Sequence, residues 1–260
     1  MPARPRSRAD MPSPSEDNPP LAPGARGARI DSLMERASQA LVRTDYAACE
    51  KNAREALRIA HAARDYERMT RIVLPLLEAR RQKRQKAQDA KRITSVNSMA
   101  ELEGKELKPG CYLLNPPGCV GVDGRALRAR ADEEGVPVIV IVHEPITRTK
   151  EWPIVALGPT TIRARVEPAK AKPTVDWFLN AIDALGDAAL ASVDAASPPQ
   201  RVDQLMACLE TIGDHEGLHR ALADECHDAM HWTPPPRSAK RAAAKQQPQT
   251  DADEPEADED

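Results

Sequence analysis

The fold of this 260-residue chain is decided by one stretch of sequence, Val136-Pro137-Val138-Ile139-Val140-Ile141-Val142. The stretch is continuous, apolar and rich in β-branched residues, which is typical of a strand buried on both faces. A second apolar run, Cys-Tyr-Leu-Leu, lies upstream at residues 111–114. Between the two runs, Asp123 is expected to cap a helix that continues through about Glu134 and ends at Gly135. Strand, helix and strand in this order predict a βαβ unit with two parallel strands.

Two further apolar stretches follow the central one. They are PIVAL at residues 153–157 and TIRARV at residues 161–166, and Gly158-Pro159 lies between them. A Gly-Pro pair is typical of a turn, so these stretches predict a β-hairpin. Together with the βαβ unit they predict a small α/β domain over residues 93–170.

Helical periodicity returns after the hairpin. From Thr174 onward, apolar residues fall on one helical face. Pro198-Pro199 separates this helix from the next, and Asp214 is expected to cap a third helix over about 215–231. The sequence therefore predicts three C-terminal helices within residues 172–232.

The region before the α/β domain is also expected to be helical. Ser32 and Glu35 fit a capping box, which predicts that the first helix starts near residue 30. Thr44-Asp45 and Arg64-Asp65 predict the junctions between successive helices. The fold class expected is therefore mixed α+β, with a helical segment at residues 30–92 preceding the α/β domain.

Small and large apolar residues follow a defined order between residues 30 and 62. Leu33 is a large residue on the first helix, and Tyr46 follows the turn. The small residues are Ala37, Cys49, Ala53 and Ala56, and Leu57 follows the last of them. In this order the segment resembles one tetratricopeptide repeat, a pair of antiparallel helices that cross at small residues. The resemblance extends in part to about residue 79, and Arg36 and His61 depart from the pattern.

The resemblance implies a protein-interaction role, with Leu33 and Tyr46 as the interaction residues. A single repeat cannot bury its own hydrophobic face, because about three repeats are normally needed. The hairpin is therefore expected to pack either against the rest of its own chain or against a protein partner. Both alternatives stay open at the level of sequence.

The two ends of the chain differ from the middle in composition. Residues 1–28 contain Pro, Arg, Ser and Ala without hydrophobic periodicity, and we expect them to be disordered. Residues 233–260 are expected to be disordered as well. Their last ten residues, 251–260, carry seven acids against a formal net charge of −3 for the whole chain. We hypothesise that this acidic end folds back on the basic residues between positions 80 and 92 and masks them.

The bulk composition excludes some classes of protein. The sequence has no run of 18 apolar residues, so no membrane span is expected. Its cysteines are odd in number and scattered, unlike a secreted disulfide framework, so we expect a cytoplasmic protein. They are Cys49, Cys111, Cys119, Cys208 and Cys226.

One motif resembles a zinc site. Residues 215–219 read His-Glu-Gly-Leu-His, the HExxH pattern in which two histidines one helical turn apart bind zinc. On a helical projection, His215, His219 and Cys226 share one face. The motif is expected to lie in the first turn of its helix and contains Gly217, which weakens a helix. We therefore expect an accidental match, with a zinc site as the alternative and no other cofactor.

A second candidate site lies at the predicted strand ends. In open α/β sheets, ligands bind outside the carboxyl ends of the strands. Asp123 follows the first strand of the βαβ unit, and His143 and Glu144 follow the second. Such a group could perform acid–base chemistry, or it could be a helix cap beside a solvated pair.

The third candidate is a basic run. Arg80, Arg81, Lys83 and Arg84 begin a series of seven basic residues that ends at Arg92. This density could neutralise nucleic-acid phosphates, but no aromatic residues are interleaved and no nucleic-acid motif accompanies it. The alternative is a solvated, charged helix.

The sequence thus favours a non-enzymatic interaction protein with a protein partner. An enzyme or small-ligand binder using Asp123, His143 and Glu144 is the first alternative. A nucleic-acid-associated protein using the basic run is the second.

Overall fold

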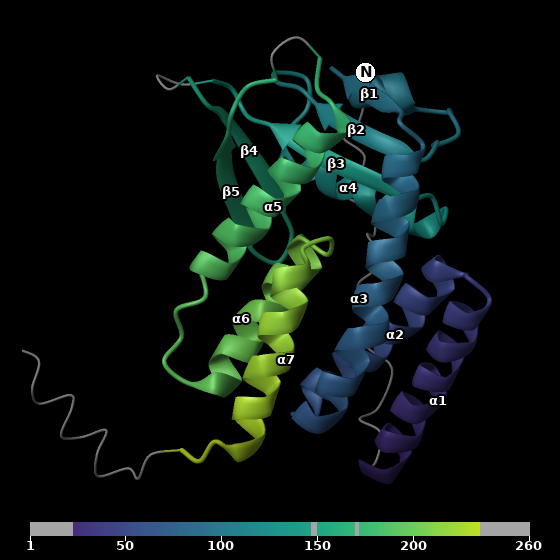
Figure 1. Ribbon diagram of the computed structural model, residues 1–260, viewed down its shortest axis with the longest axis vertical. Coiled ribbons are helices and arrows are strands. Elements are labelled where there is room, and N and C mark those ends of the chain that lie inside the picture. The colour runs from purple at the N-terminus through teal and green to yellow at the C-terminus, as the bar shows by residue number, and fades with distance from the viewer. Residues whose placement is uncertain (1–22, 147–149, 170–171, 235–260) are drawn as a thin grey trace, which may run out of the picture.

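The computed structural model of the chain describes residues 23–146, 150–169 and 172–234, and shows a five-stranded sheet flanked by helices (Figure 1). The strands follow chain order across the sheet. They are β1 (Ile93–Val96), β2 (Gly110–Leu114), β3 (Val138–His143), β4 (Trp152–Leu157) and β5 (Thr161–Val166). Strands β1, β2 and β3 are parallel to one another, β4 is antiparallel to β3, and β5 is antiparallel to β4. The mixed α+β class, the βαβ unit and the β-hairpin are therefore confirmed.

The sheet is covered on both faces. Helix α4 (Gly121–Glu133) connects β2 to β3 and packs on one face, while α3 (Tyr66–Asp89) and α5 (Val175–Ala191) pack on the other. Successive side chains of a strand point to opposite faces. Along β3, Val140 and Val142 join the core beneath α4, and Ile139 and Ile141 join the core of the helical layer.

Before the sheet, α1, α2 and α3 form two successive helical hairpins. Helix α1 spans Pro23–Val42 and α2 spans Tyr46–Ala62. The two turns are alike: Thr44 and Arg64 adopt positive φ values of 60° and 56°, and Asp45 and Asp65 follow them as N-caps. Each carboxylate accepts a hydrogen bond from the amide three residues further on. The junctions predicted at these positions are confirmed.

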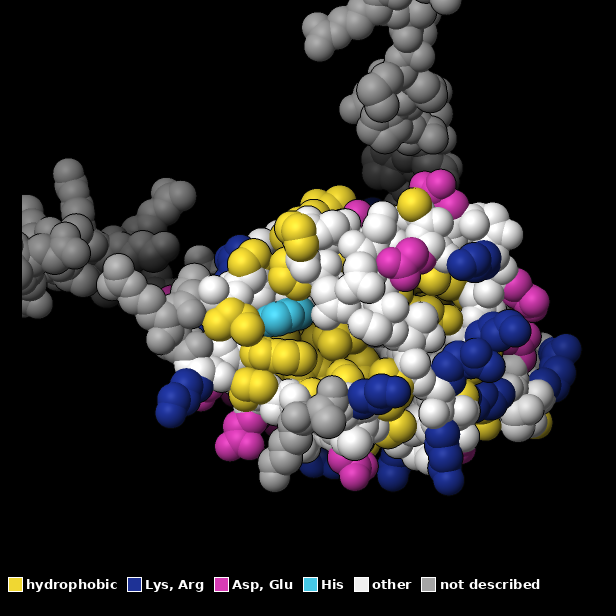
Figure 2. Space-filling view, turned by 90° about the horizontal axis from the view of Figure 1, so that it is seen from above, with side chains coloured by type: hydrophobic (Ala, Val, Ile, Leu, Met, Phe, Trp, Pro, Cys, Tyr) yellow, Lys and Arg dark blue, Asp and Glu magenta, His cyan; other side chains and the backbone are white. Residues whose placement is uncertain are grey.

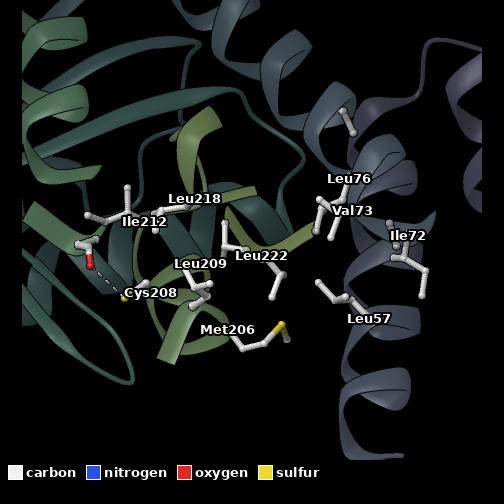
Figure 3. Close-up of a cluster of buried hydrophobic side chains, with 14 of the residues drawn as sticks. Leu57, Ile72, Val73, Leu76, Met206, Cys208, Leu209, Ile212, Leu218 and Leu222 are labelled. Atoms are coloured by element: carbon white, nitrogen blue, oxygen red, sulfur yellow. Dashed lines mark hydrogen bonds between the residues drawn. The ribbon is translucent and has the colours of Figure 1, made fainter. Parts of the chain in front are cut away.

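The hairpin helices pack against the C-terminal helices. Helices α6 (Pro198–Thr211) and α7 (Glu216–His231) complete the helical layer. Figure 3 shows Leu57 of α2 and Leu76 of α3 facing Met206 of α6 and Leu222 of α7. One hydrophobic core joins α1, α2, α3, α5, α6 and α7 to one face of the sheet, and a second core lies beneath α4 on the other face. The N-terminal hairpin therefore packs on its own chain.

All five cysteines are buried and none forms a disulfide. Burial is the main cause that raises the pKa of every one of these thiols. For Cys111 the pKa rises to about 11, and for Cys226 to about 12. The thiols are thus neutral packing groups at neutral pH.

The first helix starts earlier than its sequence indicates. Residues 23–28, which we expected to be disordered, belong to α1, and Pro23 occupies its first position. The expected capping box is wrong, because Ser32 and Glu35 lie inside the helix, where the Ser32 hydroxyl accepts a hydrogen bond from Arg36. The disorder expected for residues 1–22 and 235–260 concerns residues outside the described ones.

Two further predicted caps are also wrong. Helix α4 starts at Gly121, so Asp123 lies in its first turn, where its carboxylate accepts a 2.8 Å hydrogen bond from the amide of Val120. The N-cap of α7 is His215 rather than Asp214. The sequence did not predict strand β1 or the short 3₁₀ helix η1 (Met99–Leu102).

Candidate anion-binding site

A buried ionic network joins three helices at the centre of the molecule. The guanidinium Nε of Arg80 donates to Glu50 Oε1 at 2.8 Å, and Lys83 Nζ donates to Glu50 Oε2 at 2.6 Å. Lys83 also bonds Asp132 Oδ1 at 2.8 Å. Arg80 and Lys83 are three residues apart on α3 and therefore share one face of it. They link α3 to Glu50 on α2 and to Asp132 on α4.

The carboxylate of Glu50 is ionised although it is buried. Burial opposes ionisation, but the charges of Arg80 and Lys83 outweigh it and lower the pKa of Glu50 to about 2. Only 7% of the Arg80 side chain and 9% of the Glu50 side chain are exposed. Such a pair depends on both partners, because either charge left without the other is costly.

His219 of α7 extends the network. Its Nε2 lies 3.2 Å from Arg80 Nη1, and its Nδ1 lies 3.0 Å from the carbonyl oxygen of His215. A guanidinium only donates, so Nε2 is the acceptor and Nδ1 carries the proton that it donates to the carbonyl. Burial, followed by the positive charge of Arg80, lowers the pKa of His219 to about 3. His219 is therefore neutral in the folded protein at neutral pH.

A cavity of ≈ 380 Å³ opens beside this network. Its walls come from α2, α3, α4, the start of β3, the β4–β5 turn, the C-terminal end of α6 and the connection between α6 and α7, so it lies where the sheet meets the helices. Six basic side chains line it: Arg54, Arg80, Lys83, Arg84, Arg125 and Arg128. Four acidic ones do so as well: Glu50, Asp132, Glu210 and Asp214. The lining has a formal excess of two positive charges.

The basic residues of the lining differ in how well they are paired. The network uses Arg80 and Lys83, and Arg54 bonds Asp132 at 3.2 Å. By contrast, Arg128 is half-buried and makes one long hydrogen bond of 3.4 Å, to the carbonyl oxygen of Leu157. Burial is the main cause that lowers the pKa of Arg128, while carboxylates attract it only from a distance.

Two other arginines of the lining keep unused donors. Arg84 donates to the carbonyl oxygen of Asp214 at 3.0 Å and lies 3.9 Å from the exposed carboxylate of Asp183. Arg125 forms no hydrogen bond or ion pair with any residue that the structure describes. A guanidinium carries five N–H donors. Most donors of Arg84, Arg125 and Arg128 thus remain available to a ligand.

The cavity lies at the opposite edge of the sheet from the predicted site. Val136 and Val138, at the start of β3, line it. His143 ends the same strand five residues later, roughly 16 Å away at about 3.3 Å per residue. The carboxyl ends of the parallel strands therefore play no part in this cavity.

The structure disperses the residues predicted for that other edge. Asp123 lies on α4, on one side of the sheet, with its carboxylate bonded to Val120 N. The ring of His143 stacks on Trp152 at 4.5 Å, in the core of the opposite face. Glu144 pairs with Arg163 at 3.1 Å. Catalysis by this group stays a prediction, and the three residues line none of four cavities identified in the described chain.

His143 nevertheless has an unusual environment. Its Nε2 is buried without a hydrogen-bond partner, and burial lowers its pKa. Trp152 in turn contacts Trp177 of α5 edge-to-face at 5.8 Å. Figure 2, which looks onto the upper end of the molecule, shows hydrophobic side chains gathered around one histidine. At His143 itself, the contact of the ring is aromatic stacking on Trp152.

The residues of the predicted zinc motif have different environments. His215 precedes α7 and packs against Gly186, whereas both ring nitrogens of His219 are already hydrogen-bonded. Cys226 is buried in the hydrophobic core. Within the described ranges, no three His, Cys, Asp or Glu side chains are grouped so as to hold a metal ion.

The predicted basic run divides between two environments. Arg80, Lys83 and Arg84 turn inward to the network and the cavity, while Arg81 is exposed. The run therefore does not form one continuous basic stripe on α3. Nucleic-acid binding by it stays a prediction.

The predicted interaction residues are mostly internal. Leu33 is buried in the core of its own chain. Tyr46 is half-buried, with the ammonium of Lys86 4.6 Å from its ring centroid.

In the part of the chain that the structure describes, no helix has the length and apolar character needed to cross a bilayer.

Reasoning from the sequence missed the contribution of α4. Arg125 and Arg128 are three residues apart, on a different side of the helix from the sheet-facing Leu127. Their spacing was visible, but their meeting with Arg84 depends on how α3 crosses the sheet.

No known family, characterised protein or solved structure matches the chain.

Proposed function

We propose that this chain is a non-enzymatic binding protein that holds a small anionic ligand in the basic cavity. The observation that carries the proposal is Arg128, a half-buried guanidinium on the cavity wall whose single described hydrogen bond is a long one to a carbonyl. A charge removed from water without a full set of partners is unfavourable. An anion in the cavity would supply the missing partners.

Calorimetry with the full-length protein tests the proposal. We expect inorganic phosphate or sulfate to bind and to raise the melting temperature with concentration, while chloride at matched ionic strength does not. Arg128→Met is expected to weaken anion binding about tenfold or more, since a hydrogen bond to a charged group contributes roughly 1.5–3 kcal/mol. The unliganded variant should be as stable as the parent or more so, because a desolvated charge has been removed.

Arg71→Met is the matched control, since Arg71 is an exposed arginine of α3 outside the cavity. It should leave anion affinity unchanged. Equal affinities in the parent protein and in Arg128→Met would contradict the proposal.

A protein-interaction role is the second candidate. It is supported by the packing of the N-terminal hairpins, in which the tetratricopeptide-like small residues Ala37, Cys49, Ala53 and Ala56 are fully buried. Val42 on α1 and Leu74 on α3 are large hydrophobic side chains that remain exposed. If they contact a partner, the doubly substituted Val42→Glu/Leu74→Glu protein should lose co-purifying proteins that the parent retains. An unchanged set would count against this role.

A further inference from the structure

We infer that the ligand of the basic cavity is a phosphorylated small molecule with a compact aliphatic body. The inference rests on the proposed anion-binding function and adds the chemical class of the ligand. It combines three features of the cavity: the arrangement of its unpaired arginines, its charge and its apolar wall.

The arginines come from two helices and line the same cavity. Arg84 projects from α3, and Arg125 and Arg128 from α4. Arg125 and Arg128 are three residues apart and share one face of α4, so two guanidinium groups reach the cavity from α4 and one from α3. Three guanidinium groups suit a ligand group with several charged oxygens. A phosphate monoester offers three terminal oxygens, whereas a carboxylate offers two in one plane.

The charge of the lining points to the same group. Its formal excess of two positive charges matches a phosphate monoester, which carries about −1.5 to −2 at pH 7. This excess counts all four lining acids as ionised. Burial and the nearby Glu50 raise the pKa of Asp214, and a neutral Asp214 makes the lining more positive still, which also favours an anion of more than one charge.

Part of the cavity wall is aliphatic. Its apolar lining comprises Ala129, Val136, Val138, Leu157, Pro159 and Leu209. No aromatic side chain lines it, so a nucleobase would have no ring to stack on. The volume of ≈ 380 Å³ lies at the small end of the range of about 300–1,000 Å³ for ligand pockets, so the body of the ligand is compact.

The same geometry favours a small molecule over a nucleic-acid strand. Proteins that bind single strands place their basic residues along a groove and add aromatic platforms. Here only Arg54 and Arg125 of the six basic lining residues are exposed, the other four are buried or half-buried, and acidic residues share the lining. A chain of phosphodiesters would need a continuous exposed track that these positions do not form.

Isothermal titration of the full-length protein with a small series of probes tests the inference. The probes are inorganic phosphate, butyl phosphate, pentanoate, butanol and a short single-stranded DNA. We expect butyl phosphate to bind at least tenfold more tightly than inorganic phosphate, and pentanoate and butanol to bind more weakly than either. Arg125→Met should weaken both phosphates about tenfold, and Arg71→Met should weaken neither.

A wall variant separates the phosphate contacts from the body contacts. Val138→Thr keeps the size of the side chain but adds a hydroxyl. It should reduce the affinity for butyl phosphate several-fold and leave that for inorganic phosphate unchanged. The melting temperature of the variant, measured without ligand, shows whether it is folded.

The outcomes separate this inference from the proposed function. Equal binding of butyl phosphate and inorganic phosphate, or tighter binding of pentanoate, would overturn the inference and leave anion binding intact. Tighter binding of the DNA, lost in Arg125→Met, would overturn it in favour of a nucleic-acid ligand. No binding of any anion would overturn both.

Discussion

His219 shows how strongly one buried position can tie stability to pH. Its folded pKa of about 3 lies below the value near 6.5 expected for the unfolded chain. Between these values the unfolded state binds more protons, so the stability conferred by neutral His219 is complete above about pH 6.5 and is lost as the pH falls towards 3. We expect this residue to remove about 3 kcal/mol of unfolding free energy between pH 7 and pH 4.

Urea denaturation at a series of pH values measures this effect. His219→Gln keeps an acceptor for Arg80 but does not titrate, so its stability should fall less steeply over the same range. His227→Gln is the control, because His227 is exposed on the same helix. If parent and His219→Gln had equal slopes, the buried neutral imidazole would not be the source.

The pair of Glu50 and Arg80 makes a second prediction for single residues. Glu50→Leu leaves two buried cations without their shared partner, and we expect it to destabilise the protein by about 3–5 kcal/mol. Adding Arg80→Met should restore part of the loss, since it removes one of the stranded charges. The measurement is chemical denaturation at neutral pH.

An exposed ion pair provides the comparison for that experiment. Glu67 and Arg71 pair on the outer surface of α3, and Glu67→Leu should change stability by less than about 1 kcal/mol. A loss of that small size in Glu50→Leu would mean that the buried network contributes little to stability.

Among the elements, α1 makes the clearest prediction, because its start differs from the sequence-based one. Gly24 lies in its first turn, and a Cβ there would meet no atom within 4 Å. Gly24→Ala should therefore stabilise the protein by up to about 0.5 kcal/mol through helix propensity. Gly104→Ala serves as the opposite case. Gly104 has a φ of +64°, so this substitution should destabilise the protein. A helix that began near residue 30 would leave Gly24→Ala without effect on the thermal midpoint.

The elements that sequence reasoning predicted well are those with local signals. The β-branched run of β3 and the Asp caps of α2 and α3 carry their structure in neighbouring residues. Strand β1 carries none: it has four residues, Ile-Thr-Ser-Val, and is held by its pairing with β2. The caps at Ser32 and Asp214 failed because residues suited to capping also fit helix interiors and loops.

The candidate site was only half predictable. Arg80, Lys83 and Arg84 stood out as a basic run, but their inward direction depends on Glu50, which is thirty residues away from Arg80. Arg125 and Arg128 had no signal of their own. A cavity whose walls come from helices, strands and connections far apart in the sequence is set by tertiary packing, which a local pattern does not contain.

For the whole molecule, the core that the helical layer shares with the sheet predicts that these two layers unfold in a single cooperative transition. Leu57→Ala, in α2, should destabilise the protein by about 2–5 kcal/mol. Trp152 and Trp177 report on the distant sheet layer, because they contact each other at β4 and α5. Their fluorescence should therefore shift to lower denaturant together with the helical circular dichroism signal.

That measurement is made on proteins that also carry Trp232→Phe, because this substitution removes the exposed tryptophan after α7. The fluorescence then comes from Trp152 and Trp177. Two separate transitions, with tryptophan fluorescence unaffected by Leu57→Ala, would show that the N-terminal helices unfold as an independent unit.

The five buried thiols can report local opening of the native protein. They lie on α2, β2, the β2–α4 connection, α6 and α7, so nearly every layer contains one. An alkylating reagent can reach each thiol only while its surroundings are open, and mass spectrometry can read the five sites separately. Ligand in the cavity should then slow alkylation at Cys49 on α2, whose neighbour Glu50 lines that cavity, more than at Cys119, at the far end of α4.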